Sequence, residues 1–134
     1  MHKAVELSSL DLRYEWYRLR DDAREARLRA SIAERGIEEP LCGVDTPAAR
    51  CLLDGFKRFR SAKKLSIECV PYVSLGEEEA TGILRLMRAS THHGLNILEQ
   101  ALFVVDLVSI HGMSVAEIFQ ILSRSRGWMS MRRR

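Results

Sequence analysis

The stretch CLLDGFKRFRSAKKL, residues 51–65, decides the fold class because it changes from strand-like to helical character within a few residues. A short apolar run ends in an Asp-Gly pair at Gly55, where glycine can adopt the sharp turn that other residues resist. After this turn, apolar residues recur at helical spacing, with Lys57, Arg58 and Arg60 around them. The stretch therefore predicts a strand, a glycine turn and a basic helix.

The start of this basic helix is a candidate site for a phosphate or another polyanion. A helix start offers unpaired N–H groups and the positive end of the helix dipole, and Lys57 and Arg58 fall within the first turn. The alternative is an ordinary amphipathic helix with a solvated basic face. Because the Gly-x-x-x-x-Gly-Lys-Ser/Thr and Gly-x-Gly-x-x-Gly patterns are both absent, the residues alone leave the two interpretations open.

Outward from this stretch, the pattern of apolar and turn residues indicates an α+β protein. Pro71 suggests an edge or strand-end position for the strand that contains it. The helix at 96–110 is so apolar that we interpret it as the spine joining the sheet region to the C-terminal helices. Strands are predicted at 5–10, 41–44, 50–53 and 68–73, and a loop at 12–20. Helices are predicted at 21–35, from 76 to an end within 90–94, at 96–110 and at 115–122.

Length and composition limit the classes of protein that fit. With 134 residues the chain can form one small α/β domain with an appended helical unit. No apolar run approaches the roughly 20 residues of a membrane helix, and the N-terminus lacks a leader pattern, so we expect a cytoplasmic protein with no membrane contact. Cys42, Cys51 and Cys69 form no C-x-x-C motif, which favours reduced, buried thiols over a zinc or redox site.

The net charge of +3 is concentrated at the C-terminus. Residues 123–134 hold five arginines and no acid, which leaves 16 basic and 18 acidic residues elsewhere. Residues 123–125 are predicted to form a turn between a short helix, capped by Ser114, and a second helix that begins near Arg126. Two short helices of which the second is basic fit a helix-turn-helix that reads DNA, and a plain helical hairpin is the alternative.

Four segments in order resemble the ParB family of DNA partition proteins. SIAERGIEEPL at 31–41 is similar to the family's SIxExGxxxPixV segment, and DGFKRFRSAKKL at 54–65 to its GERRxRAAxxxG box. LNILEQA at 95–101 is similar to its LNPLEEA helix start, and GMSVAEI at 112–118 begins a stretch similar to its helix-turn-helix. The resemblance implies a ParB/sulfiredoxin-like α/β domain over residues 1–90 and a linker helix with a helix-turn-helix over 91–134, which we expect to be truncated at its C-terminus.

The resemblance also implies a CTP-binding, DNA-binding homodimer that acts in partition, segregation or the maintenance of a mobile element, in association with a nucleoid or plasmid. The implied DNA is double-stranded and site-specific. The implied nucleotide-binding residues are Gly55, Phe56, Lys57, Arg58, Arg60, Arg88 and His92. The implied DNA-binding residues are Arg124, Ser125, Arg126, Ser130, Arg132, Arg133 and Arg134.

Several positions depart from the family pattern. Arg88 and Ala89 stand where the family has the Glu-Asn pair that faces magnesium, and neither supplies the oxygen ligands that this ion prefers. We therefore expect no metal site, little dependence on Mg2+ and at most weak CTPase activity. A nuclease or nucleotide hydrolase on the same fold is an alternative, against which the lack of a carboxylate cluster near the basic helix counts. A degenerate ParB-like adaptor that binds only protein is another.

Overall fold

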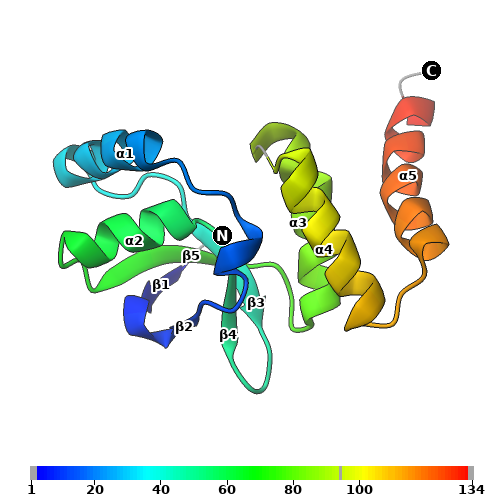
Figure 1. The fold of residues 1–134 in the computed structure, drawn as a ribbon, viewed down its shortest axis with the longest axis horizontal. Helices are drawn as coiled ribbons and strands as arrows, with labels where there is room; N and C mark the ends of the chain where they lie inside the picture. Colours follow the sequence, from blue (N-terminus) through cyan, green and yellow to red (C-terminus); the bar gives the residue numbers. More distant parts are fainter. Residues whose placement is uncertain (1–2, 94, 133–134) are drawn as a thin grey trace. The chain divides into compact units, whose positions relative to one another are not determined.

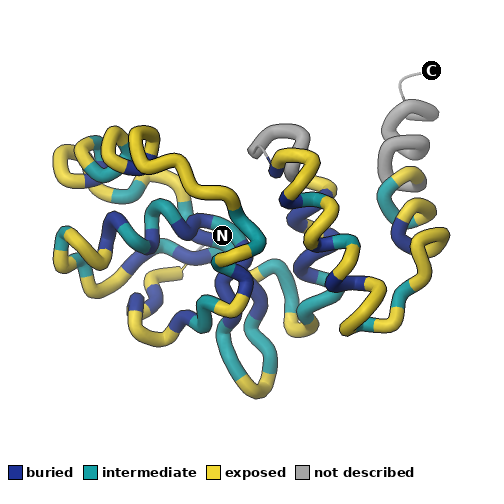
Figure 2. Tube along the Cα trace, viewed as in Figure 1, coloured by how far each residue is buried: buried dark blue, intermediate teal, exposed yellow. Residues whose placement is uncertain are grey.

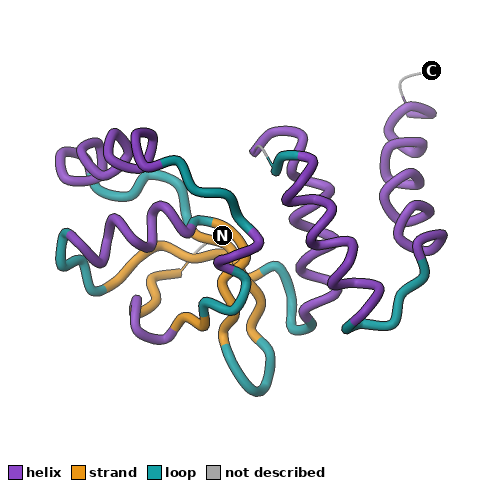
Figure 3. Tube along the Cα trace, in the orientation of Figure 1, coloured by secondary structure: helices purple, strands orange, loops and turns teal. Residues whose placement is uncertain are grey.

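The computed structural model describes the backbone of residues 3–93 and 95–132, and side chains within these ranges except at 90–93 and 124–132. Its contacts divide the chain into two compact units, Met1–Gly82 and Ile83–Arg134. The elements of Figures 1 and 3 are, in order, β1 (Lys3–Glu6), the 3-10 helix η1 (Leu7–Ser9), β2 (Leu10–Asp11), the 3-10 helix η2 (Glu15–Tyr17), α1 (Asp22–Arg35), β3 (Leu41–Asp45), β4 (Arg50–Asp54), α2 (Phe56–Lys64), β5 (Cys69–Ser74), α3 (Glu79–His93), α4 (Ile97–Ser109) and α5 (Val115–Arg132).

The first unit is built on a mixed five-stranded sheet in the order β1-β5-β3-β4-β2. β3 and β4 form an antiparallel hairpin, β5 pairs in parallel with β3, and β1 pairs antiparallel with β5. The strand expected at 5–10 is wrong as a single element, because a 3-10 turn separates β1 from β2. The edge or strand-end position expected from Pro71 is also wrong, since β5 lies between β1 and β3 and Pro71 is its third residue. Pro71 is accommodated because pairing with β3 begins only at the next residue, Tyr72.

Helix α1 packs against α2, and α2 lies next to the sheet (Figure 1). The sequence signals for α1 are confirmed: the Asp21 side chain accepts a hydrogen bond from the Arg24 N–H at the N-terminus, and Gly36 ends the helix with a φ of 77°. α2 follows β4 directly, and Phe56, Phe59 and Ala62 place its apolar face in the core. The strand, turn and helix predicted from residues 51–65 are therefore present.

Buried residues of the first unit line the strands and one side of α2 (Figure 2). The core extends over both faces of the sheet, because neighbouring strand residues such as Leu52 and Leu53 point to opposite faces and Leu53 lies against Gly82 at the start of α3. Every strand contributes residues to this core. Removal of their apolar surface from water therefore stabilises all five strands together. The fully buried members are Leu41 and Val44 of β3, Leu52 and Leu53 of β4, Ala62 of α2 and Tyr72 of β5.

The second unit is helical. A capping box between Asn96 and Glu99 starts α4, and Ser114 with Glu117 makes the equivalent pair of hydrogen bonds at the start of α5. α3 ends at His93, within the range 90–94 where its end was expected. Among the described residues, no helix is long and apolar enough to cross a membrane.

The second unit differs from expectation at one turn, and α4 combines buried and exposed apolar residues. The turn expected at 123–125 is wrong, because α5 runs through it as one helix. Neither Gly nor Pro occupies these three positions, and Ser and Arg lower helix propensity only slightly, so nothing there breaks the helix. α4 buries one stripe, and many of its other apolar side chains are exposed: Ile97, Leu98, Leu102, Val105 and Val108. The apolar composition of α4 therefore comprises a buried stripe and an exposed apolar surface.

Candidate functional site: the start of helix α2

Gly55 joins β4 to α2 in a conformation that only glycine adopts easily. Its φ is 103° and its ψ is 23°, in the left-handed region. A Cβ at this position would lie 2.8 Å from Leu41 Cγ, so the backbone also packs too closely for a side chain. As the N-cap residue, Gly55 supplies no side chain to the first N–H groups of α2. No side chain of the N-cap residue therefore shields the positive end of the helix dipole.

Phe56 and Lys57 follow at the first two helical positions and differ in exposure. The Phe56 side chain is buried, so this residue can offer a ligand only its backbone N–H. Lys57 is half-buried, and no hydrogen bond or ion pair of its ammonium is found among the described residues. Lys57 is therefore the cation of the first turn best able to reach an anion from solvent.

Arg58 is held by the backbone of the segment before β3. Its guanidinium donates to the Glu39 carbonyl at 2.8 Å and to the Pro40 carbonyl at 2.9 Å. It also lies 3.6 Å from Asp54 Oδ2 and is only 16% exposed. Arg58 thus fastens α2 to residues 39–40, a structural role that its sequence position did not reveal.

Arg60 forms a half-buried ion pair with Glu25 of α1 and Glu15 of η2. Its Nε lies 3.0 Å from both Glu25 carboxylate oxygens, and its terminal nitrogens lie 2.7 Å from Glu25 and 2.7 Å from Glu15. The hydrogen bond from Arg60 lowers the pKa of the Glu25 carboxyl, and the same bond raises the pKa of Arg60. Arg60 therefore joins three elements, and its charge is already matched by carboxylates.

Arg18 is a residue of this site that sequence reasoning did not single out. It comes from the segment after η2, and its guanidinium lies 2.6 Å from Asp54 Oδ1 and 3.4 Å from the Leu53 carbonyl. Asp54 is the last residue of β4 and precedes Gly55. The arginine-rich composition of residues 13–20 was the available signal, but the spacing along the chain gave no sign of which arginine turns toward α2.

The other residues implied by the resemblance lie in the second unit. Arg88 is exposed on α3, and the side chain of His92 lies outside the described residues. The side chains of Arg124, Ser125, Arg126, Ser130 and Arg132 on α5 also lie outside them, as do Arg133 and Arg134 altogether. The roles of these residues remain predictions. Among the described residues, no group of three His, Cys, Asp or Glu side chains is placed to hold a metal ion.

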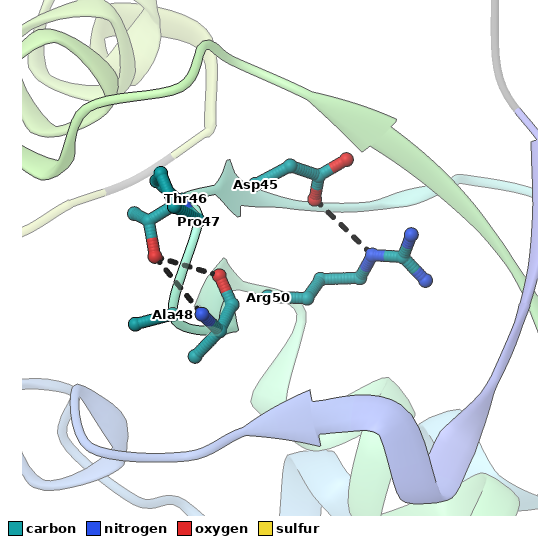
Figure 4. A pocket seen from close by; sticks show the side chains of 6 residues that line it. Asp45, Thr46, Pro47, Ala48 and Arg50 are labelled. Carbon is teal, nitrogen blue, oxygen red and sulfur yellow. Dashed lines mark hydrogen bonds and ion pairs between the residues drawn. The ribbon is translucent and has the colours of Figure 1, made fainter.

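A separate hollow of about 260 Å³ lies at the tip of the β3–β4 hairpin (Figure 4). Residues 45–50 line it, and Thr46 and Ala49 exchange the hydrogen bonds that close the turn. Asp45 accepts hydrogen bonds from Arg50 at 3.1 Å and from the Tyr72 hydroxyl at 2.9 Å. Because these partners belong to the sheet itself, the cluster fixes the hairpin, and it lies at the opposite end of β4 from Gly55.

Comparison with known proteins identifies the fold. No protein-family model matches the chain, and no curated protein sequence matches it significantly. A pNOB8-like ParB N-domain superposes with a TM-score of 0.58 at 16% identity, over 98% of this chain and 47% of the other. The C-terminally truncated chromosome-partitioning protein ParB from Caulobacter crescentus, complexed with CTP-gamma-S, gives 0.57 at 20% identity, over 91% and 71%. Sulfiredoxin from Arabidopsis thaliana gives 0.51 at 18% identity, over 55% and 83%.

These likenesses define the chain as an α+β protein. The sulfiredoxin match covers about half of this chain, whereas the ParB N-domain matches extend over nearly all of it. The chain has the ParB/sulfiredoxin-like fold.

Proposed function

We propose that this protein is a ParB-like DNA-binding protein whose nucleoside triphosphate pocket, for CTP, lies at the start of α2. The observation that carries the proposal is Gly55, held in the left-handed region between a buried strand and a basic helix. The chain also shares its fold, over 91% of its length, with a ParB protein that was crystallised with CTP-gamma-S.

In this pocket the backbone N–H groups of Phe56 and Lys57 and the Lys57 ammonium would hold phosphate oxygens. Charge-assisted hydrogen bonds of this kind are among the stronger polar contacts in proteins. Arg58 would contribute from its fixed position between α2 and residues 39–40. That Arg88 and His92 take part in nucleotide binding, with Arg88 neutralising phosphate in place of a magnesium ion, is what the resemblance to the ParB family implies.

The DNA-binding part of the proposal rests on the charge of α5. Residues 123–134 carry five arginines and no acid. Residues 123–132 belong to α5, the helix that starts at Val115. Such a cluster is the electrostatic footprint of phosphate contact. We propose that a homodimer binds a site in double-stranded DNA through this helix, in partition, segregation or the maintenance of a mobile element.

A protein-binding adaptor is the second candidate, and two observations favour it. Arg58 and Arg60 already have intramolecular partners, which reduces the positive charge available to a nucleotide. The exposed apolar side chains of α4 offer a surface for another protein. The adaptor would neither bind CTP nor show salt-dependent affinity for DNA.

Titration of the full chain with labelled CTP, ATP and GTP, with and without Mg2+, tests the pocket. The proposal predicts saturable binding with CTP preferred. Arg58→Ala is a poor first variant because it also removes two hydrogen bonds to the backbone of residues 39–40. Absence of binding to all three nucleotides would favour the adaptor.

A further inference from the structure

The two oxygens of a single carboxylate face the two arginines at the start of α2. Arg18 Nη1 lies 2.6 Å from Asp54 Oδ1, and Arg58 Nη2 lies 3.6 Å from Asp54 Oδ2. All three side chains are largely withdrawn from water, at 16–17% exposed. The two arginines come from segments forty residues apart in the sequence, so the fold itself brings them to this carboxylate.

Asp54 is also the residue immediately before Gly55, at the point where the proposed phosphate site begins. A carboxylate here opposes the attraction that the helix dipole and the nearby cations exert on an anion. The arginines hold the Asp54 carboxylate in place, and Asp54 in turn neutralises one of their two charges. The negative charge of Asp54 therefore opposes the binding of a phosphate at the start of α2.

We propose that Asp54 is a built-in counter-anion that competes with a bound polyphosphate for Arg18 and Arg58. The inference rests on the proposed nucleotide pocket and adds its regulation. When a polyphosphate enters, its oxygens replace the Asp54 carboxylate as acceptors for at least one guanidinium. Arg58 keeps its place during this exchange because the Glu39 and Pro40 carbonyls hold it independently of Asp54.

The exchange makes binding selective for ligands of high charge. A carboxylate offers two oxygens and one negative charge, whereas a triphosphate offers more of both and can satisfy bidentate guanidinium geometry. A ligand with a single phosphate group gains less when it displaces Asp54. The pocket therefore discriminates by the number of phosphates, and Asp54 lowers the affinity for all of them.

The test is the variant Asp54→Asn, which keeps the size of the side chain and an acceptor oxygen for Arg18. Its matched control is Asp45→Asn, which removes the same charge from a carboxylate paired with Arg50 and Lys3 at the opposite end of β4. The residues at the two ends of β4 are roughly 13 Å apart at the usual rise per residue. If Asp54→Asn fails to fold, as circular dichroism would show, Asp54→Ser answers the same question.

The full chain and each variant are titrated with CTP, with CMP and with inorganic triphosphate, with affinity measured by calorimetry. Asp54→Asn should bind CTP and triphosphate about tenfold more tightly than the wild type, as removal of one nearby charge in a partly buried site predicts. The ratio of CTP affinity to CMP affinity should be smaller in Asp54→Asn than in the wild type. Asp45→Asn should bind CTP and CMP with affinities within about twofold of the wild-type values.

Suppose that the wild type binds CTP, so that the pocket is supported. The inference is then overturned if Asp54→Asn binds CTP no more tightly than the wild type, or if Asp45→Asn gains as much affinity as Asp54→Asn. If neither wild type nor Asp54→Asn binds CTP or triphosphate, the pocket fails and the inference fails with it.

Discussion

Replacing Gly55 with alanine should destabilise the protein through two separate effects. At a φ of 103° a residue with a Cβ is strained, which costs about 1–2 kcal/mol. The new Cβ would also lie 2.8 Å from Leu41 Cγ and 3.3 Å from Leu41 Cα, inside the packed contact between α2 and β3. Overpacking of this kind costs about 1–3 kcal/mol, so we expect Gly55→Ala to lower the free energy of unfolding by about 2–5 kcal/mol.

Gly112→Ala is the matched control for the first effect. Gly112 also has a positive φ, 69°, but a Cβ there would meet no atom within 4 Å. Its expected loss is the backbone strain alone, about 1–2 kcal/mol. Urea unfolding followed by circular dichroism measures both variants. Equal losses for the two would refute the close approach to Leu41, and a loss below about 1 kcal/mol for Gly55→Ala would refute the strained turn as well.

Three further predictions concern charge. Arg60 lowers the pKa of Glu25, so this pair stabilises the protein fully above the usual carboxyl pKa, and the stabilisation is lost as the pH falls through the lowered pKa. Glu25→Gln should therefore make the free energy of unfolding depend less on pH below about pH 5. An unchanged acid unfolding transition in this variant contradicts the prediction. EDTA should change CTP affinity by less than about threefold, since Arg88 and Ala89 supply no magnesium ligand. A larger loss of affinity would show that CTP binding depends on a metal ion. Neutralising Arg124 and Arg126 should lower the log–log salt slope of DNA binding, measured by fluorescence anisotropy, by about 0.9 per lost phosphate contact; a salt-insensitive signal would favour the adaptor.

Much of the fold was predictable because its signals are local. The Asp-Gly turn after an apolar run, the acidic start of α1 with its glycine stop, and the Ser114 cap of α5 each act within one or two turns of chain. The order of strands was not predictable in this way. β5 lies inside the sheet although it contains Pro71, because the offset of its pairing with β3 avoids the proline, and such a register is set by tertiary packing.

The glycine turn and the basic helix of the candidate site were predicted from the sequence, but the interactions of their side chains were not. The basic residues of α2 were visible in the sequence, and so was the glycine that starts the helix. Their partners were not, because Glu25 and Glu15 reach Arg60 from 35 and 45 residues away. Arg18 was hidden for the same reason, since only the folded chain shows which arginine of residues 13–20 meets Asp54.

The central claim is that the start of α2 holds the phosphates of CTP, and one lysine pair tests it most directly. Lys57 lies in the first turn of α2, and Lys63 is an exposed lysine in the last turn of the same helix. Calorimetric titration of the full chain with CTP should show Lys57→Ala weakened by about tenfold or more, as loss of a charge-assisted phosphate contact requires, and Lys63→Ala unchanged. Equal affinity of the two variants, or no CTP binding by the wild type, would contradict the claim.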